Sequence, residues 1–191
     1  QGTVDTGKTP ATRVITDSAG RQVEVPLDPQ RIACTCPEAG YALAMYGKGD
    51  RIAATTDGMQ RDVILTEMYP HLKGLPVPKK GGAINIEELI RIKADLIFVK
   101  VDTINNEAAM EKLSQAKIPV VAVEYSSIEE QIKAMQMMAS IVGAEEEGQR
   151  YQQFYQQTMD LVQERVAAIP DDKRVTIYHS SQEATRTDSQ G

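Results

Sequence analysis

The sequence contains no tryptophan, two phenylalanines, two cysteines and two histidines among its 191 residues. So few histidines and cysteines leave little material for a transition-metal site or for nucleophilic catalysis. No apolar run approaches the ~20 residues that a membrane-spanning helix requires. Basic side chains are also in the minority, with 21 Lys and Arg against 27 Asp and Glu, for a formal net charge of −6. An acidic chain without a basic face suits nucleic acid poorly, so we expect no nucleic-acid partner.

The two cysteines, Cys34 and Cys36, lie in one short apolar stretch. On a strand their side chains would point to the same face, and a disulfide between them would close a strained ring. Their spacing matches no common zinc or redox pattern. We therefore interpret both as small buried residues, with a thiolate ligand as the alternative.

Residues 2–9 have the spacing of a phosphate-binding loop, including Gly7, Lys8 and Thr9. That loop functions only between a buried strand and a helix. Here Pro10 follows at once and leads into an extended segment. We interpret residues 1–12 as a flexible tail and do not infer nucleotide hydrolysis.

What the sequence does contain is a globular composition, 41% hydrophobic and 25% charged, with a regular alternation of strand and helix patterns. A hairpin is expected at residues 14–25, around the turn that begins at Asp17. Strands are then expected at 31–35, 51–55, 95–100 and 119–123, and helices at 37–47, 62–69, from Asn85, at 106–116 and at 128–142. This alternation predicts an α/β fold, with a parallel, Rossmann-like sheet in a lobe spanning residues 13–143.

A long amphipathic helix is expected at residues 144–170. Its methionine, aromatic and aliphatic residues recur at helical spacing, so we interpret them as core packing and not as a cofactor box. A helix of about 25 residues is ~37 Å long, more than a small lobe spans. Residues 173–178 follow as one further strand, which forms no domain alone. We therefore expect a truncated chain, in which residues 171–191 begin a second lobe.

A series of short motifs runs through residues 13–191 in a specific order. They are residues 15–26; Pro29 to Ile32; Cys36 and Pro37; residues 45–47 and 49–53; Gly81 and Gly82; residues 85–87 and 92–97; and residues 174–178 and 187–191. Together they resemble the substrate-binding proteins of the bacterial importers for iron–siderophores, haem and cobalamin.

The resemblance implies two α/β lobes joined by one long helix. It implies capture of a metal chelate (a ferric siderophore, a corrinoid or haem) between the lobes and its delivery to an ABC permease. It also implies an extracytoplasmic location, in the periplasm or as a lipoprotein on the cell surface. No enzymatic activity, intrinsic cofactor or resident metal is expected.

Ligands of parallel sheets bind beyond the carboxyl ends of the strands, where the loops converge. Cys36 stands where the family often has serine, and Tyr41 where it often has an acidic residue, which makes this lip less polar. The expected ligand-binding residues are Thr35, Cys36, Pro37, Asp57, Gly58, Met59, Gly81, Gly82, Lys100, Val101, Asp102 and His179.

Glu87 matches the position from which the family's glutamate pairs with permease arginines. A first-turn glutamate also complements the helix dipole, and both roles can hold at once.

Two other functions stay open. An oxyanion such as molybdate needs only N–H groups and hydroxyls, whereas a bare cation is disfavoured because the strand ends lack histidine. An enzyme on a doubly wound sheet is the third hypothesis, but no nucleophile elbow or pair of catalytic carboxylates is evident.

Overall fold

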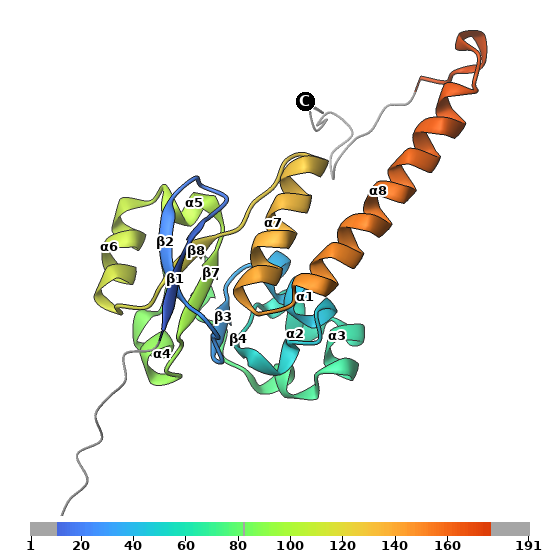
Figure 1. The fold of residues 1–191 in the computed structure, drawn as a ribbon. Coiled ribbons are helices and arrows are strands. Elements are labelled where there is room, and N and C mark those ends of the chain that lie inside the picture. Colours follow the sequence, from blue (N-terminus) through green and yellow to red (C-terminus); the bar gives the residue numbers. More distant parts are fainter. Residues whose placement is uncertain (1–10, 82, 177–191) are drawn as a thin grey trace, which may run out of the picture. The chain divides into compact units, whose positions relative to one another are not determined.

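The computed structural model of the chain describes residues 11–81 and 83–176 (Figure 1). The chain divides into two compact units, Gln1–Gln149 and Arg150–Gly191. The phosphate-loop motif of residues 2–9 lies outside the described residues.

The first unit is built on a four-stranded parallel sheet with the order β4-β3-β7-β8 (Figure 1). Ile32 is paired with both Ile52 and Leu96, and Val99 with Ala122. Every residue of these strands is buried, as is typical of a parallel sheet covered on both faces. The sheet confirms the predicted α/β class; its strands are β3 (Ile32–Cys34), β4 (Ile52–Ala54), β7 (Leu96–Val99) and β8 (Val120–Ala122).

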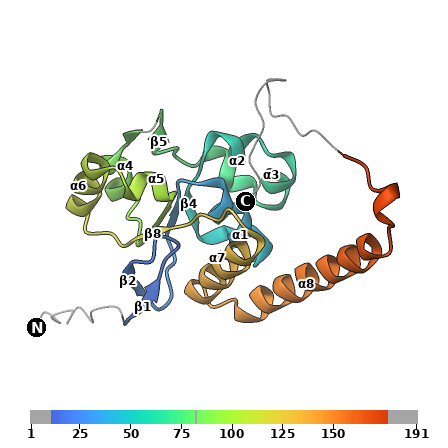
Figure 2. The ribbon, with the colours of Figure 1, turned by 90° about the horizontal axis from the view of Figure 1, so that it is seen from above.

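Helices cover both faces of the sheet (Figure 2). On one face lie α4 (Ile86–Arg91) and α6 (Glu107–Gln115), whose Leu89 and Leu113 join Ile97 and Val99 in one buried cluster. On the other face α1 (Pro37–Met45) packs with α7 (Ile128–Ile141). The Tyr46 hydroxyl at the end of α1 donates to the Met135 carbonyl of α7 at 2.9 Å.

Short elements fill the connections between these strands and helices. The helix expected at 62–69 is confirmed as α3, but another helix, α2, comes directly before it. The two are separated at Asp62, whose side chain caps α3 by accepting the Leu65 N–H at 2.9 Å. The connecting elements are η1 (Gly49–Arg51), α2 (Asp57–Arg61), α3 (Val63–Met68), η2 (Pro70–Gly74), β5 (Lys79–Lys80), β6 (Ala83–Ile84) and α5 (Val101–Ile104).

The predicted hairpin is formed by β1 (Thr12–Thr16) and β2 (Gln22–Pro26), which pair antiparallel. Its turn is attached to the edge of the sheet. Asp17 accepts the Ala122 N–H at 3.1 Å, and the Ser18 N–H donates to the Ala122 carbonyl at 3.1 Å. The turn therefore sits at the carboxyl end of β8.

The predicted long helix is α8 (Glu145–Ala167), 23 residues and about 35 Å long. Its start belongs to the first unit, where Gly148 comes close to Ala139 of α7. Along the rest of α8 the expected core packing is wrong for the described structure, since Phe154 is 68% and Val166 47% exposed. Helical spacing places these side chains on one face, but it does not supply a partner that covers them.

The strand expected at 173–178 is not found in its described part. Asp171–Lys173 forms the 3₁₀ turn η3, and residues 174–176 have no regular structure, because no described strand pairs with them. The division into a lobe at 13–143, a backbone helix at 144–170 and a second lobe from 171 stays a prediction. Of the helices that the structure describes, none is long and apolar enough to cross a membrane.

Candidate functional site

The carboxyl ends of the two central strands, β3 and β7, are tied together. The Thr35 hydroxyl after β3 donates to the Phe98 carbonyl of β7 at 2.8 Å, and the Thr35 N–H donates to the same oxygen at 3.1 Å. Thr35 is buried, so it positions the two strand ends, and the residues that follow it form the surface at this edge of the sheet.

An ion pair lies on this edge of the sheet. Lys100 Nζ, directly after β7, is 3.0 Å from Glu38 Oε1 in the first turn of α1. The hydrogen bond from this pair raises the pKa of Lys100, so its charge persists at neutral pH. Glu38 Oε2 is buried and has no hydrogen-bond partner among the described residues. The pair thus offers a bound solute a partly exposed cation, whereas the second Glu38 oxygen is enclosed within the lobe.

A second lysine lies close by. Lys79 of β5 is 3.7 Å from Asp102 Oδ1, and its ammonium donates to the Thr103 hydroxyl at 3.0 Å. Lys79 and Lys100 both act to lower the pKa of Cys36, which places the two ammonium groups around the end of β3. The strand ends therefore carry two ammonium groups, each beside a carboxylate, within an acidic chain.

Cys36 is the N-cap residue of α1 and is completely buried, like Cys34 in β3. Burial raises the pKa of Cys36 to about 12 and holds that of Cys34 well above its ordinary value. Both are free thiols that stay protonated at neutral pH, as the interpretation as small buried residues requires. The described residues form no cluster of three or more His, Cys, Asp or Glu side chains that could hold a metal ion.

The structure places the other expected residues in different environments. Pro37, Asp57 and Gly58 are exposed beside the strand ends. Met59 is fully buried, and a Cβ on Gly40 would come within 2.4 Å of its sulfur, so Met59 packs α2 against α1 inside the lobe. Gly81 has a φ of +55° in the β5–β6 turn, a conformation that favours glycine. Gly82 and His179 lie outside the described residues.

A cavity of about 580 Å³, here called the hairpin pocket, lies at the β8 edge of the same surface. Most of its lining residues were not predicted from the sequence, although Glu124, Tyr125 and Ser126 directly follow the last strand of the sheet. The rule that selected the ends of β3, β4 and β7 would have selected these residues as well. The hairpin pocket is lined by Thr16, Asp17, Ser18, Gly20, Val101, Glu124, Tyr125, Ser126, Glu130, Lys133, Ala134 and Met137.

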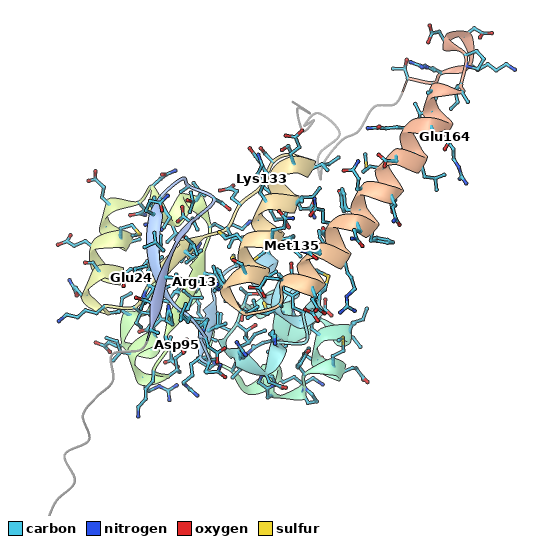
Figure 3. The ribbon with its side chains drawn as sticks, in the orientation of Figure 1. Arg13, Glu24, Asp95, Lys133, Met135 and Glu164 are labelled. Atoms are coloured by element: carbon cyan, nitrogen blue, oxygen red, sulfur yellow. The ribbon has the colours of Figure 1, made fainter. Side chains whose placement is uncertain are left out.

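Two kinds of side chain line the hairpin pocket. Val101, Ala134 and Met137 give it an apolar wall, while Glu124 and Lys133 bring charges; Lys133 is labelled on α7 in Figure 3. The Glu130 carboxylate accepts both the N–H and the hydroxyl of Ser126 at 2.8 Å, and these bonds lower its pKa. Because Glu130 is engaged in this way, Glu124 and Lys133 are the charged groups best placed to meet a ligand.

Solved structures share this fold. The molybdate periplasmic binding protein MolA of Haemophilus influenzae is similar with a TM-score of 0.75 at 19% identity, over 89% of this chain and 58% of MolA. The TroA-like periplasmic binding protein FepB of Veillonella parvula gives 0.67 at 22% identity, over 82% of this chain and 50% of FepB. The heme binding protein HmuT gives 0.56 at 23% identity, over 78% and 46%. The chain thus spans about half the length of the structures that it matches.

No curated protein sequence matches the chain. The family model described as periplasmic binding protein matches residues 37–188, which include the carboxyl ends of β4, β7 and β8 and most of the hairpin pocket. This family and the similar structures are solute-binding proteins and not enzymes. The resemblance inferred from the sequence is confirmed: the chain belongs to the periplasmic binding protein family.

Proposed function

We propose that the protein is the extracytoplasmic solute-binding component of an ABC importer. It captures a metal chelate (a ferric siderophore, a corrinoid or haem) between two lobes and delivers it to a membrane permease. Membership of the periplasmic binding protein family supports the capture of a solute, and one similar structure is a heme binding protein. Anchoring as a lipoprotein stays a prediction.

The observation that carries this proposal is the convergence of charged groups at the ends of β3 and β7. Lys100 and Lys79 are partly exposed, and the Asp102 carboxylate beside Lys79 is largely exposed. A solute that carries both negative charge and hydrogen-bond donors complements this set. Anionic chelates have that combination, and the exposed Pro37, Asp57 and Asp102 would border them.

An oxyanion is the second candidate solute. The similarity to MolA, a molybdate binding protein, and the two lysines at the strand ends favour it. A bare cation is not favoured, because these strand ends present lysines.

The test is calorimetric titration of the natural full-length protein with haem, cobalamin, ferric siderophores and molybdate. We expect saturable binding of one class of metal chelate. Lys100→Ala should weaken that binding about tenfold or more, since a hydrogen bond to a charged group contributes about 1.5–3 kcal/mol. The melting temperature should change little, because the Lys100–Glu38 pair is partly exposed.

Lys112→Ala is the matched control, since Lys112 is an exposed lysine of α6, away from the strand ends. Binding of none of these solutes would contradict the proposed function. Binding that Lys100→Ala and Lys112→Ala leave equally strong would keep the function but exclude the ion pair from the site.

A further inference from the structure

The hairpin pocket is continuous with the charged groups at the strand ends. Val101, which lines it, stands between Lys100 and Asp102 in the chain. Glu124 also lines the pocket, just after the neighbouring strand β8, and is close enough to Lys100 to act on its pKa. A solute held at Lys100 therefore has the hairpin pocket beside it.

The size of the hairpin pocket distinguishes between the two solute classes. Its volume of about 580 Å³ is in the range of sites that hold drug-sized organic molecules. A tetrahedral oxyanion would occupy only a small part of that space. An apolar wall adjoining a charged edge is also what a large amphiphilic ligand requires and what a small hydrated anion does not.

Two of the three carboxylates that line the hairpin pocket, Asp17 and Glu130, are bound by groups of the protein. Asp17 is bound by the Arg21 guanidinium at 2.7 Å and by the Ala122 N–H at 3.1 Å, and Glu130 is bound by Ser126. These bonds hold the hairpin turn and the start of α7 in place, so the pocket is formed before any ligand arrives. A preformed pocket binds without the cost of ordering its walls.

We propose that the hairpin pocket receives an apolar or aromatic arm of the solute whose anionic part binds Lys100, so that the solute is a large organic chelate and not an oxyanion. This inference rests on the proposed function. It specifies the side of the lobe along which the solute extends. Met137, Ala134 and Val101 are the residues that would select for the arm.

The experiment fills the hairpin pocket and measures the binding of two probes. Ala134→Trp and, separately, the partly exposed Met137→Trp are made in the natural full-length protein and titrated with the iron chelate that the wild type binds best, and with molybdate. Ala108→Trp is the matched control, because it adds the same side chain to an exposed position of α6 that lines a different hollow. Circular dichroism and melting temperature establish that each variant is folded.

We expect both filled variants to lose at least tenfold in affinity for the chelate, while Ala108→Trp stays within twofold of the wild type. Met137→Ala, which only enlarges the pocket, should lower the affinity for the chelate by less than the two tryptophan variants do. If folded Met137→Trp binds the chelate as well as the wild type does, the inference is overturned and the proposed function stands. The inference is also overturned if the wild type binds molybdate but no chelate. If the wild type binds neither, the proposed function itself is contradicted.

Discussion

Asp17 is the residue on which the placement of the hairpin depends. Its carboxylate is buried and accepts the N–H groups of Ala19 at 3.0 Å and Ala122 at 3.1 Å, besides the Arg21 guanidinium. It thus joins a local turn to a strand that is distant in the sequence. Asp17 also lies within the motif of residues 15–26, so this part of the family resemblance has a structural basis.

Asp17→Ala is expected to lower the free energy of unfolding by about 2–4 kcal/mol, because it leaves buried N–H groups and a guanidinium without their acceptor. Urea unfolding followed by circular dichroism measures the loss. Asp28→Ala is the control, since Asp28 pairs with Arg51 but is largely exposed, and it should cost much less. Equal losses in the two variants would contradict the role assigned to Asp17.

Asp95 has a comparable role at the other end of the sheet (Figure 3). Its carboxylate accepts the N–H groups of Gln30 at 2.7 Å and Arg31 at 3.0 Å, just before β3. The motif of residues 92–97 could be recognised from the sequence, but this partner could not, because the contact joins segments far apart in the chain. By contrast the helix expected from Asn85 does begin there, and Asn85 caps it by accepting the Glu88 N–H at 3.1 Å, an interaction formed within one helical turn.

At the scale of elements, the contact between α7 and the start of α8 depends on Gly148. A Cβ at this position would lie 2.7 Å from Ala139 Cβ, closer than real Cβ atoms approach. The absence of a side chain therefore lets the two helices pack directly against each other.

Gly148→Ala is expected to destabilise the protein by about 1 kcal/mol. Overpacking costs about 1–3 kcal/mol and exceeds the gain of up to about 1 kcal/mol from helix propensity. Chemical unfolding measures the net effect. Gly74→Ala is the control, since nothing lies within 4 Å of its added Cβ.

A double-mutant cycle tests the contact itself. Introducing Ala139→Gly should remove the penalty of Gly148→Ala, because the two Cβ atoms would no longer meet. Strictly additive effects would show that the crossing of α7 and α8 does not depend on this pair.

At the scale of the whole molecule, the proposed function requires a surface that would meet a permease. Glu87 is exposed in the first turn of α4, behind the cap Asn85, whereas its neighbour Glu88 is paired with Arg91. Exposed charges of this kind steer association and fix orientation more than they add stability. We therefore keep Glu87 as the predicted docking residue.

Glu87→Ala is expected to reduce permease-dependent uptake several-fold while leaving solute affinity unchanged. Uptake in cells that lack the wild-type protein, combined with calorimetry of the purified variant, separates the two effects. Glu107→Ala is a close control, because Glu107 is also an exposed first-turn glutamate behind an asparagine cap, in α6. Uptake equal to that of the wild type would leave Glu87 with a helix-dipole role only.

Most of the elements, and the α/β class, follow from local patterns of residues. The parallel strands, the helices between them, the hairpin and the caps each depend on a pattern read over a few residues, so local physics suffices to predict them. The order of its motifs also identified the family.

Which side chains come into contact depends on how the elements pack in three dimensions. The pairing of Lys100 with Glu38, the burial of Met59 and the hairpin pocket all arise between segments distant in the chain. Periodicity shows that one face of a helix is apolar, but not what covers it, and so the stripe on α8 was predicted as core although Phe154 is exposed. These contacts depend on packing between elements, which a local sequence pattern does not encode.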